Sequence, residues 1–397
     1  MASRLIRLSH ITFQVSNARK VTRDLAAKYQ FHPFAARGLD GGSPYQVALR
    51  NGGVVFMVNE NSRKNPPNSS LLYDFALPLP TPDTACNVSF EVEDVPGFCQ
   101  WLIGNGCRVL VPPKELHDDY GSVTFCVIKS VLGNVQHTLI DRTRYRDGFL
   151  PGFQTLDVVN DLAAHSNMTH VDHVTYACPR GTTPHVIKWY ERCFGYKHFP
   201  LRQWEDPEKG FEISGPRMGL RLTTIECPGL REGGKLVLGE SLPQEGINQV
   251  DQFLQHHEKG GIQHVGLFTP DIFKAASSMA QQGVCFASQP SSYYSDPTKQ
   301  EEMRGVGLEP DLLLKFGILL DFAAEDAESV TTPSKKFLLQ VFAEPLFSKD
   351  SVYLELIERR GAEGFGEGNI RALWRSLQDL MESSNPTEQE EKSSAGV

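Results

Sequence analysis

The chain has 397 residues, of which 40% are hydrophobic and 22% are charged, and its formal net charge is −9. These values are typical of a globular protein that forms two domains of ordinary size or one large domain. The negative charge argues against general binding to nucleic acid, and no apolar run approaches the ~18 residues that a membrane-spanning helix needs.

The cysteines and the N-terminus bear on the cellular compartment. The eight cysteines form no C-x-x-C pair and no regular framework, which indicates a reducing compartment and buried thiols. The chain has no acidic residue before Asp24, although it has five basic ones by then: Arg4, Arg7, Arg19, Lys20 and Arg23. Such a start is typical of a mitochondrial presequence. However, residues 8–15 already alternate as the first strand of a folded chain would, which favours the structural interpretation.

The first 150 residues predict two units built in the same order, a strand, then a helix, then further strands. Turn signals at Asn51-Gly52-Gly53 and Gly133-Asn134 predict hairpins. The first unit has a strand at 8–15, a helix at 17–30 and strands within 46–59, followed by a polar loop at 59–70. The second unit has strands from Asn87 and Cys107 and at 122–130 and 135–141, with a helix at 94–105.

The second part of the chain repeats the first. Val-Asp-His-Val-Thr-Tyr at 171–176 aligns with Leu-Ser-His-Ile-Thr-Phe at 8–13, and a helix follows each, the second at about 184–194. The segment from His264 aligns with the one from Asn87 in the same way, and Tyr353-Leu-Glu-Leu-Ile-Glu-Arg359 aligns with Gln136-His-Thr-Leu-Ile-Asp-Arg142. We therefore predict an α+β fold of four βαβββ modules that form two open barrels.

These alignments divide the chain into four parts. We expect an N-terminal barrel at 1–150, a linker at 151–168, a C-terminal barrel at 169–383 with a terminal helix at 369–381, and a disordered tail at 384–397. The acidic, Ser/Thr-rich run at 322–335 predicts a loop between strands.

Three residues of the second half form a candidate metal site. Strand alternation turns Glu355 inward between Tyr353 and Ile357, where a lone carboxylate is costly to desolvate unless a cation meets it. His173 and His264 lie in similar strand contexts. Two imidazoles and one carboxylate are the ligand set of non-haem Fe(II) oxygenases.

A single strand histidine is more often a satisfied core residue, but three candidates at equivalent repeat positions favour a metal. Their counterparts in the first half are His10, Asn87 and Thr138. One ligand of three makes no metal site, so we expect the N-terminal half to be metal-free and structural. Asp172, beside His173, is predicted to be a turn or an orienting neighbour at most.

Several motifs over residues 5–383 together resemble the 4-hydroxyphenylpyruvate dioxygenase family. They are Phe149-Leu-Pro-Gly-Phe153, Gly261-Ile-Gln-His264, Phe337-Leu-Leu-Gln-Val-Phe342, Leu354-Glu-Leu-Ile-Glu-Arg359 and Gly364-Phe-Gly-Glu-Gly-Asn369. The resemblance implies the vicinal-oxygen-chelate fold and Fe(II) held by His173, His264 and Glu355. It also implies a set of substrate contacts: Gln249, Gln263, Gln340, Phe342, Phe365, Asn369 and Ile370.

The chain departs from the family pattern at three positions. Gly239 replaces a polar contact, Tyr353 replaces a phenylalanine, and Ile370 replaces the phenylalanine after Gly-Asn. The related hydroxymandelate synthases resemble this chain in having an aliphatic residue at the last position. Without a flat aromatic wall the substrate ring can turn, so that the benzylic carbon faces the oxidant.

The resemblance therefore implies an Fe(II)-dependent dioxygenase that takes an aromatic 2-oxo acid and O₂. The preferred reaction is 4-hydroxyphenylpyruvate to 4-hydroxymandelate with release of CO₂, as a step toward the coenzyme Q head group in the mitochondrion. Three alternatives stay open: homogentisate formation in tyrosine catabolism, a catalytically silent member with a binding or scaffold role, and an extradiol ring-cleaving enzyme. A cytoplasmic location and a homodimer are also compatible with the sequence.

Overall fold

The structure is a computed structural model, and it leaves several stretches of the chain undescribed. The described residues are 4–39, 45–61, 70–78, 81–146, 148–156, 167–199, 210–215, 219–230, 232–244, 246–257, 259–322, 336–348 and 351–370. The predicted tail at 384–397, nearly all of the helix predicted at 369–381, and most of the loops predicted at 59–70 and 322–335 lie outside these residues.

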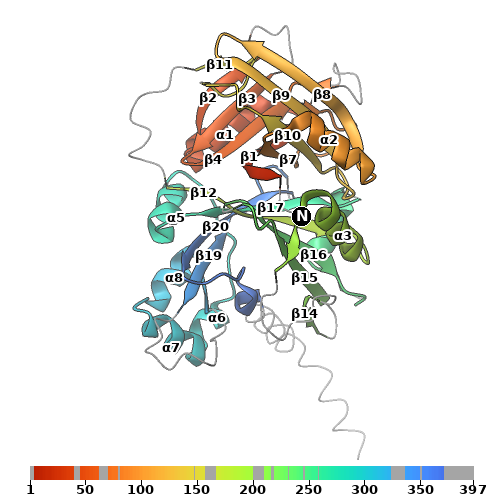
Figure 1. The fold of residues 1–397 in the computed structure, drawn as a ribbon. Helices are drawn as coiled ribbons and strands as arrows, with labels where there is room; N and C mark the ends of the chain where they lie inside the picture. Colours follow the sequence, from red (N-terminus) through yellow and green to blue (C-terminus); the bar gives the residue numbers. More distant parts are fainter. Residues whose placement is uncertain are drawn as a thin grey trace, which may run out of the picture.

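The N-terminal half, residues 5–155, is one curled mixed sheet with two helices (Figure 1). Its strand order is β11-β2-β3-β4-β1-β7-β10-β9-β8, and β5 and β6 form a separate small hairpin. The elements are β1 Leu5–Val15, α1 Ala18–Tyr29, β2 His32–Arg37, β3 Gln46–Asn51, β4 Val54–Glu60, β5 Ser70–Leu71, β6 Asp74–Phe75, β7 Thr84–Val92, α2 Val95–Gly104, β8 Arg108–Asp118, β9 Gly121–Lys129, β10 Gln136–Asp141 and β11 Gln154–Thr155.

The C-terminal half, residues 170–370, repeats this plan with larger insertions. Its main strand order is β13-β15-β16-β12-β17-β20-β19-β18, and β14 pairs with β15. The elements are β12 His170–Cys178, α3 Thr183–Phe194, β13 Lys197–His198, β14 Phe211–Ser214, β15 Gly219–Glu226, β16 Lys235–Ser241, α4 Gln249–His257, β17 Gly261–Phe268, α5 Ile272–Gln281, α6 Ser291–Ser295, α7 Pro297–Gly305, α8 Pro310–Phe316, β18 Leu319–Phe322, β19 Phe337–Phe342 and β20 Tyr353–Arg360.

The four-module repeat is visible in the strand pairing. The first strand of each module pairs in parallel with the last strand of the same module: β1 with β4, β7 with β10, β12 with β16, and β17 with β20. The two modules of each half then join antiparallel, β1 to β7 and β12 to β17. Each half is therefore two βαβββ modules side by side, with β5, β6, β11, β14, α4 and α6–α8 as additions.

One apolar core runs through both halves, which meet where β7 faces β17 (Figure 1). A polar contact lies inside this junction: Nε2 of the buried His137 on β10 is 2.8 Å from the hydroxyl of Tyr190 on α3. The ring of Phe194 packs against His137 and Phe90. The helices also bury apolar faces, as α1 does with Val21, Leu25 and Tyr29. The fixed junction holds the central strands of both sheets in place.

Most of the predicted strands and helices form where the alternation placed them, and three features differ. The predicted linker contains β11, which pairs with β2. The β5–β6 hairpin and the helices α6 to α8 were not predicted, because such short elements leave no clear periodicity. Among the described residues, no helix is long and apolar enough to cross a membrane.

Candidate metal centre

The three predicted ligands lie on three adjacent strands at the middle of the C-terminal sheet. His173 on β12 is opposite Gly266 on β17, and Gly266 is in turn opposite Glu355 on β20. His264 lies two residues before Gly266, so its side chain points to the same face of the sheet. The ligand atoms of His173, His264 and Glu355 all lie within 4.8 Å of one another. The strand order thus brings together residues that are up to 182 positions apart (355 − 173).

A carboxylate oxygen of Glu355 is the focus of this cluster. Its Oε2 is 3.1 Å from Nε2 of His173 and 3.4 Å from Nε2 of His264. Burial alone raises the pKa of the Glu355 carboxyl, but the two imidazoles outweigh it and the pKa falls below its ordinary value. Burial lowers the pKa of His264, against the pull of Glu355. The cluster therefore holds an ionised carboxylate in a buried setting.

A β-bulge gives His173 a second carboxylate partner. The pairing of β12 with β17 shifts register between Val171 and His173, so the intervening Asp172 does not alternate to the far face. Nδ1 of His173 donates to Oδ1 of Asp172 at 2.9 Å, which turns Nε2 toward Glu355. Burial opposes protonation of His173, but the two carboxylates outweigh it and raise its pKa to about 9.

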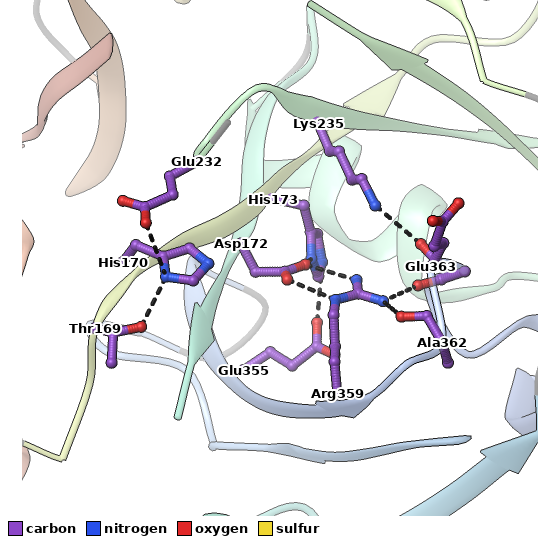
Figure 2. Close-up of polar contacts among 11 residues, drawn as sticks. Thr169, His170, Asp172, His173, Glu232, Lys235, Glu355, Arg359, Ala362 and Glu363 are labelled. Atoms are coloured by element: carbon purple, nitrogen blue, oxygen red, sulfur yellow. Dashed lines mark hydrogen bonds and ion pairs between the residues drawn. The ribbon is translucent and has the colours of Figure 1, made fainter. Parts of the chain in front are cut away.

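Arg359 anchors Asp172 from the other side (Figure 2). Its Nε and Nη2 donate to the two carboxylate oxygens of Asp172 at 2.7 and 2.8 Å. Its Nη1 donates to the carbonyl oxygens of Ala362 and Gly364. Burial opposes ionisation of the Asp172 carboxyl. The hydrogen bonds that it accepts from Arg359 and His173 outweigh this effect and hold the pKa of Asp172 well below its usual range. A rigid chain of contacts therefore runs from the loop after β20 to the imidazole of His173.

The residues present fit a divalent metal ion. Oε1 of Glu355 and Nδ1 of His264 are buried and have no hydrogen-bond partner among the described residues. A buried polar atom without a partner costs free energy, and a cation at the centre of the cluster would give the carboxylate oxygen of Glu355 a partner. Two imidazole nitrogens, one carboxylate oxygen and a carboxylate behind one imidazole are a usual donor set for non-haem Fe(II).

Gly266 makes room for His173. A Cβ at this position would lie 2.3 Å from Cε1 and 2.5 Å from Nδ1 of the His173 ring. Such distances are far inside van der Waals contact, so a larger residue at 266 would displace the imidazole. The absence of a side chain at 266 is thus a requirement of the centre.

Aromatic side chains surround His264. The Tyr353 ring stacks on the imidazole, with centroids 4.8 Å apart and an interplanar angle of 21°. The Phe342 ring meets both edge-on, with its centroid 6.2 Å from each. These rings keep His264 in one orientation and exclude water from its side of the centre.

The predicted polar substrate contacts lie at different depths. Gln263 and Gln340 are buried, and Oε1 of Gln340 has no partner among the described residues. Nε2 of Gln263 donates weakly, at 3.4 Å, to the backbone carbonyl of Gln249. The Gln249 side chain is exposed at the start of α4. Substrate contact by these residues stays a prediction.

The remaining predicted contacts lie after β20. Phe365 is buried in one apolar cluster, and the half-buried Ile370 packs against that cluster. Asn369 is fully buried, and its Oδ1 accepts a hydrogen bond from the Tyr293 hydroxyl at 2.8 Å. A Cβ at Gly239 would meet Val250 at 3.4 Å, so the backbone there is not tightly confined. These roles also stay predictions.

The sequence patterns do not identify the residues that orient the ligands. Asp172 is predicted to be a minor neighbour and Arg359 has no predicted role, whereas the structure pairs the two with each other. Gly266 was not singled out at all. The Asp-His pair at the repeat position of Ser9-His10 is the one signal that could have indicated a charged neighbour for His173.

Comparisons with known proteins agree on one family, although no protein-family model matches the sequence. A 4-hydroxyphenylpyruvate dioxygenase-like protein of Mus musculus is 41% identical over 379 residues, which are 94% of this chain and 96% of the relative. Its counterpart in Homo sapiens is 40% identical over 383 residues, 96% and 98% of the two chains. A 4-hydroxyphenylpyruvate dioxygenase of Yarrowia lipolytica is 29% identical over 377 residues, 93% and 90% of the two chains.

A solved structure confirms the predicted fold class. A triple mutant of 4-hydroxymandelate synthase from Streptomyces coelicolor superposes with a TM-score of 0.73 at 20% identity, over 95% of this chain and 99% of the other. The two open barrels of βαβββ modules are thus a vicinal-oxygen-chelate fold. With the identities to the relatives above, the chain belongs to the 4-hydroxyphenylpyruvate dioxygenase family, among its 4-hydroxyphenylpyruvate dioxygenase-like proteins.

Proposed function

We propose that this protein is an Fe(II)-dependent dioxygenase of an aromatic 2-oxo acid. The observation that carries the proposal is the convergence of His173, His264 and Glu355 on one point, with a buried carboxylate oxygen that has no partner among the described residues. The dioxygenases and the synthase that this chain resembles are named for 4-hydroxyphenylpyruvate and 4-hydroxymandelate, which supports an aromatic keto acid as the substrate class.

The protein's own groups position the reactants and exclude water. Asp172, held by Arg359, fixes His173 with Nε2 toward the ligand cluster. Tyr353 and Phe342 provide an apolar wall beside His264, where a substrate ring can stack. Bound Fe(II) would supply the redox chemistry by which O₂ oxidises the keto acid with loss of CO₂.

The buried amides give the wall polarity. The side-chain carbonyl oxygen of Gln340 has no partner among the described residues, and it lies against Gly366, where an added Cβ would overlap it. An unpaired acceptor of this kind suits the hydroxyl of a phenolic substrate. We assign Gln263 and Gln340 orientation of the substrate, without proton transfer.

For the product we propose 4-hydroxymandelate. Ile370, beside Phe365, replaces the aromatic wall that the homogentisate-forming reaction is expected to use. An aliphatic side chain lets the ring turn until its benzylic carbon faces the oxidant. Iron-loaded protein incubated with 4-hydroxyphenylpyruvate and O₂ should yield 4-hydroxymandelate by mass spectrometry. Homogentisate as the sole product would overturn this assignment, and protein that holds iron but gives neither product would support a silent family member.

Ile370→Phe tests the wall directly. It should shift at least part of the product toward homogentisate, because a flat ring would again steer the substrate. Ile370→Leu is the matched control, since it keeps an aliphatic side chain of the same size and should leave the product ratio unchanged. An unchanged product ratio in both variants would show that the side chain at position 370 does not determine the product.

We further propose that this product enters synthesis of the coenzyme Q head group in the mitochondrion. The family resemblance supports the location. Subcellular fractionation of cells that express the tagged full chain tests it, and a purely cytosolic signal would contradict it.

A further inference from the structure

A cavity lies between the two halves, and none of its lining residues belongs to the candidate metal centre. It is lined by the β9–β10 turn and β6 of the N-terminal half and by the end of α4 in the C-terminal half. Its volume is about 520 Å³, within the range of small-molecule pockets. The halves touch closely here, because a Cβ at Gly133 would overlap the carbonyl oxygen of Gly260. The pocket therefore has a defined wall on each side.

The charges of the described residues that line this cavity have one sign. The cationic or titratable lining residues are Arg108, Lys129, His256, His257 and Lys259. No Asp or Glu is among its described lining residues, although the whole chain carries a net charge of −9. Within the described part of the chain, no carboxylate forms an ion pair with Arg108, Lys129 or Lys259. Positive charge gathered in a cleft, with no counter-charge among the described lining residues, attracts anions.

The half-buried ammonium of Lys129 has only backbone carbonyl oxygens as partners among the described residues, those of Gly133 and Val135. Burial, together with the smaller effects of the charges of Arg108 and Lys259, lowers the pKa of Lys129 to about 8 against the opposing influence of Cys86. A bound anion would stabilise all three cations at once.

The buried lining also holds hydrogen-bond acceptors that have no donor. Gln136 is 1% exposed; its Nε2 donates to the Phe75 carbonyl oxygen, whereas its Oε1 has no partner among the described residues. His257 is 9% exposed; its Nδ1 donates to the Phe253 carbonyl oxygen, which leaves Nε2 as an unpartnered acceptor on the neutral ring. An occupant that satisfies both atoms must carry N–H or O–H groups.

We propose that this pocket binds a small organic anion that also carries hydroxyl or amino donors. Arg108, Lys129 and Lys259 recognise its anionic group, and Gln136 and His257 accept its donors. A phosphate or a carboxylate could supply the charge, so the probes must separate the two. The site uses none of the three candidate metal ligands.

Calorimetric titration of the full chain, in EDTA so that metal binding does not contribute, tests both parts of the proposal. The probes are glycerol 3-phosphate, glycerate and sulfate. Sulfate carries a doubly negative charge like glycerol 3-phosphate but has no donor. At least one of the two donor-bearing probes should bind about tenfold or more tightly than sulfate, and the better one identifies phosphate or carboxylate as the preferred group. Equal affinity for all three probes, or no binding up to millimolar concentration, would overturn the proposal.

Two matched double variants test the location. Arg108→Gln with Lys259→Gln removes two exposed cations of the pocket and should weaken the better probe by about tenfold or more. Lys114→Gln with Lys274→Gln removes two exposed lysines elsewhere and should leave the affinity unchanged. Both pairs change the net charge equally, so an equal loss in the two would show nonspecific attraction and contradict the assignment.

Lysine acetylation followed by mass spectrometry gives a readout without substitution. The better probe should protect Lys129 and Lys259 from acetylation and leave Lys114 unprotected. Protection of all three, or of none, would contradict a site in this pocket.

Discussion

The two halves of the molecule place a histidine at the same point of the same fold, and only one half builds a candidate metal centre around it. His10 on β1 and His173 on β12 each follow a register shift, between Leu8 and His10 in one sheet and between Val171 and His173 in the other. The bulge therefore belongs to the repeated architecture. What differs is the set of side chains that the neighbouring strands direct at the imidazole.

In the N-terminal half this set is neutral and closed on itself. Nε2 of His10 is 3.1 Å from the hydroxyl of Ser89, the residue that takes the place of Gly266. Asn87 hydrogen-bonds to Thr138, and these two replace His264 and Glu355. A nearby carboxylate, that of Asp74 in the β5–β6 hairpin, accepts hydrogen bonds from the side-chain amides of Asn87, Gln14 and Asn59. Amides and hydroxyls thus satisfy the same positions that in the C-terminal half converge on an unpaired carboxylate oxygen.

The contrast extends to proton affinity. Burial lowers the pKa of His10 to about 3, so the ring is neutral at any physiological pH. Burial acts on His173 too, but the carboxylates of Glu355 and Asp172 outweigh it and raise the pKa to about 9. The comparison teaches that a repeated position in a duplicated fold gains its chemistry from charged neighbours, here Asp172 on the same strand and Glu355 on β20.

The largest expected effect comes from exchanging the residue opposite each histidine. Gly266→Ser would place a Cβ against the His173 ring, and we expect metal affinity to fall by about 100-fold or more, as in other cases where a ligand's support is lost. Co(II) titration monitored by absorbance measures this. Ser89→Gly is the counterpart; it removes one hydrogen bond to His10, at a cost of about 1 kcal/mol in unfolding free energy, and should leave metal affinity unchanged. Tight Co(II) binding by Gly266→Ser would contradict the steric account.

The residue before each histidine should have the next largest effect. Asp172→Asn removes the charge that pairs with Arg359 and orients His173, so metal affinity should fall about 10- to 100-fold. The buried guanidinium left without its partner should also cost about 3 kcal/mol in urea unfolding. Ser9→Ala, the matched change in the first half, should cost under ~1 kcal/mol. Similar losses in the two variants would show that Asp172 has no special role.

A smaller effect concerns stability against acid. The folded pKa of His10 lies below its ordinary value of 6.5, so below pH 6.5 the unfolded chain takes up a proton that the folded chain does not. This lowers the unfolding free energy as pH falls from 6.5 toward 3. Between pH 7 and pH 5 the loss should be about 2 kcal/mol. The His10→Gln variant cannot bind this proton. Its unfolding free energy in urea should therefore fall by about 2 kcal/mol less than that of the wild type between pH 7 and pH 5. The same pH dependence in both proteins would contradict a neutral buried His10.

Much of this comparison could be read from the sequence, because strand alternation and the repeat fix both residue faces and module order. His173, His264 and Glu355 could be aligned with His10, Asn87 and Thr138 on that basis alone. The bulge at Asp172 could not, since a register shift depends on how two strands pair across the sheet.

Contacts that cross long stretches of chain were equally hidden. Arg359 reaches Asp172 across 187 positions, and Asp74 reaches Asn87 from a two-residue strand that leaves no periodic signal. The steric need for Gly266 depends on where the His173 ring lies, which only the folded geometry gives. Pattern predicts which residues face inward, whereas packing decides which of them meet.

The most direct measurement is metal stoichiometry in the intact chain. Anaerobic protein titrated with Fe(II), or with Co(II) as a spectroscopic substitute, should bind one equivalent with a melting temperature that rises on binding. Glu355→Gln should abolish this, whereas Thr138→Val, the equivalent position of the N-terminal half, should keep it. Two equivalents per chain, or one equivalent retained by Glu355→Gln, would contradict a single centre built from His173, His264 and Glu355.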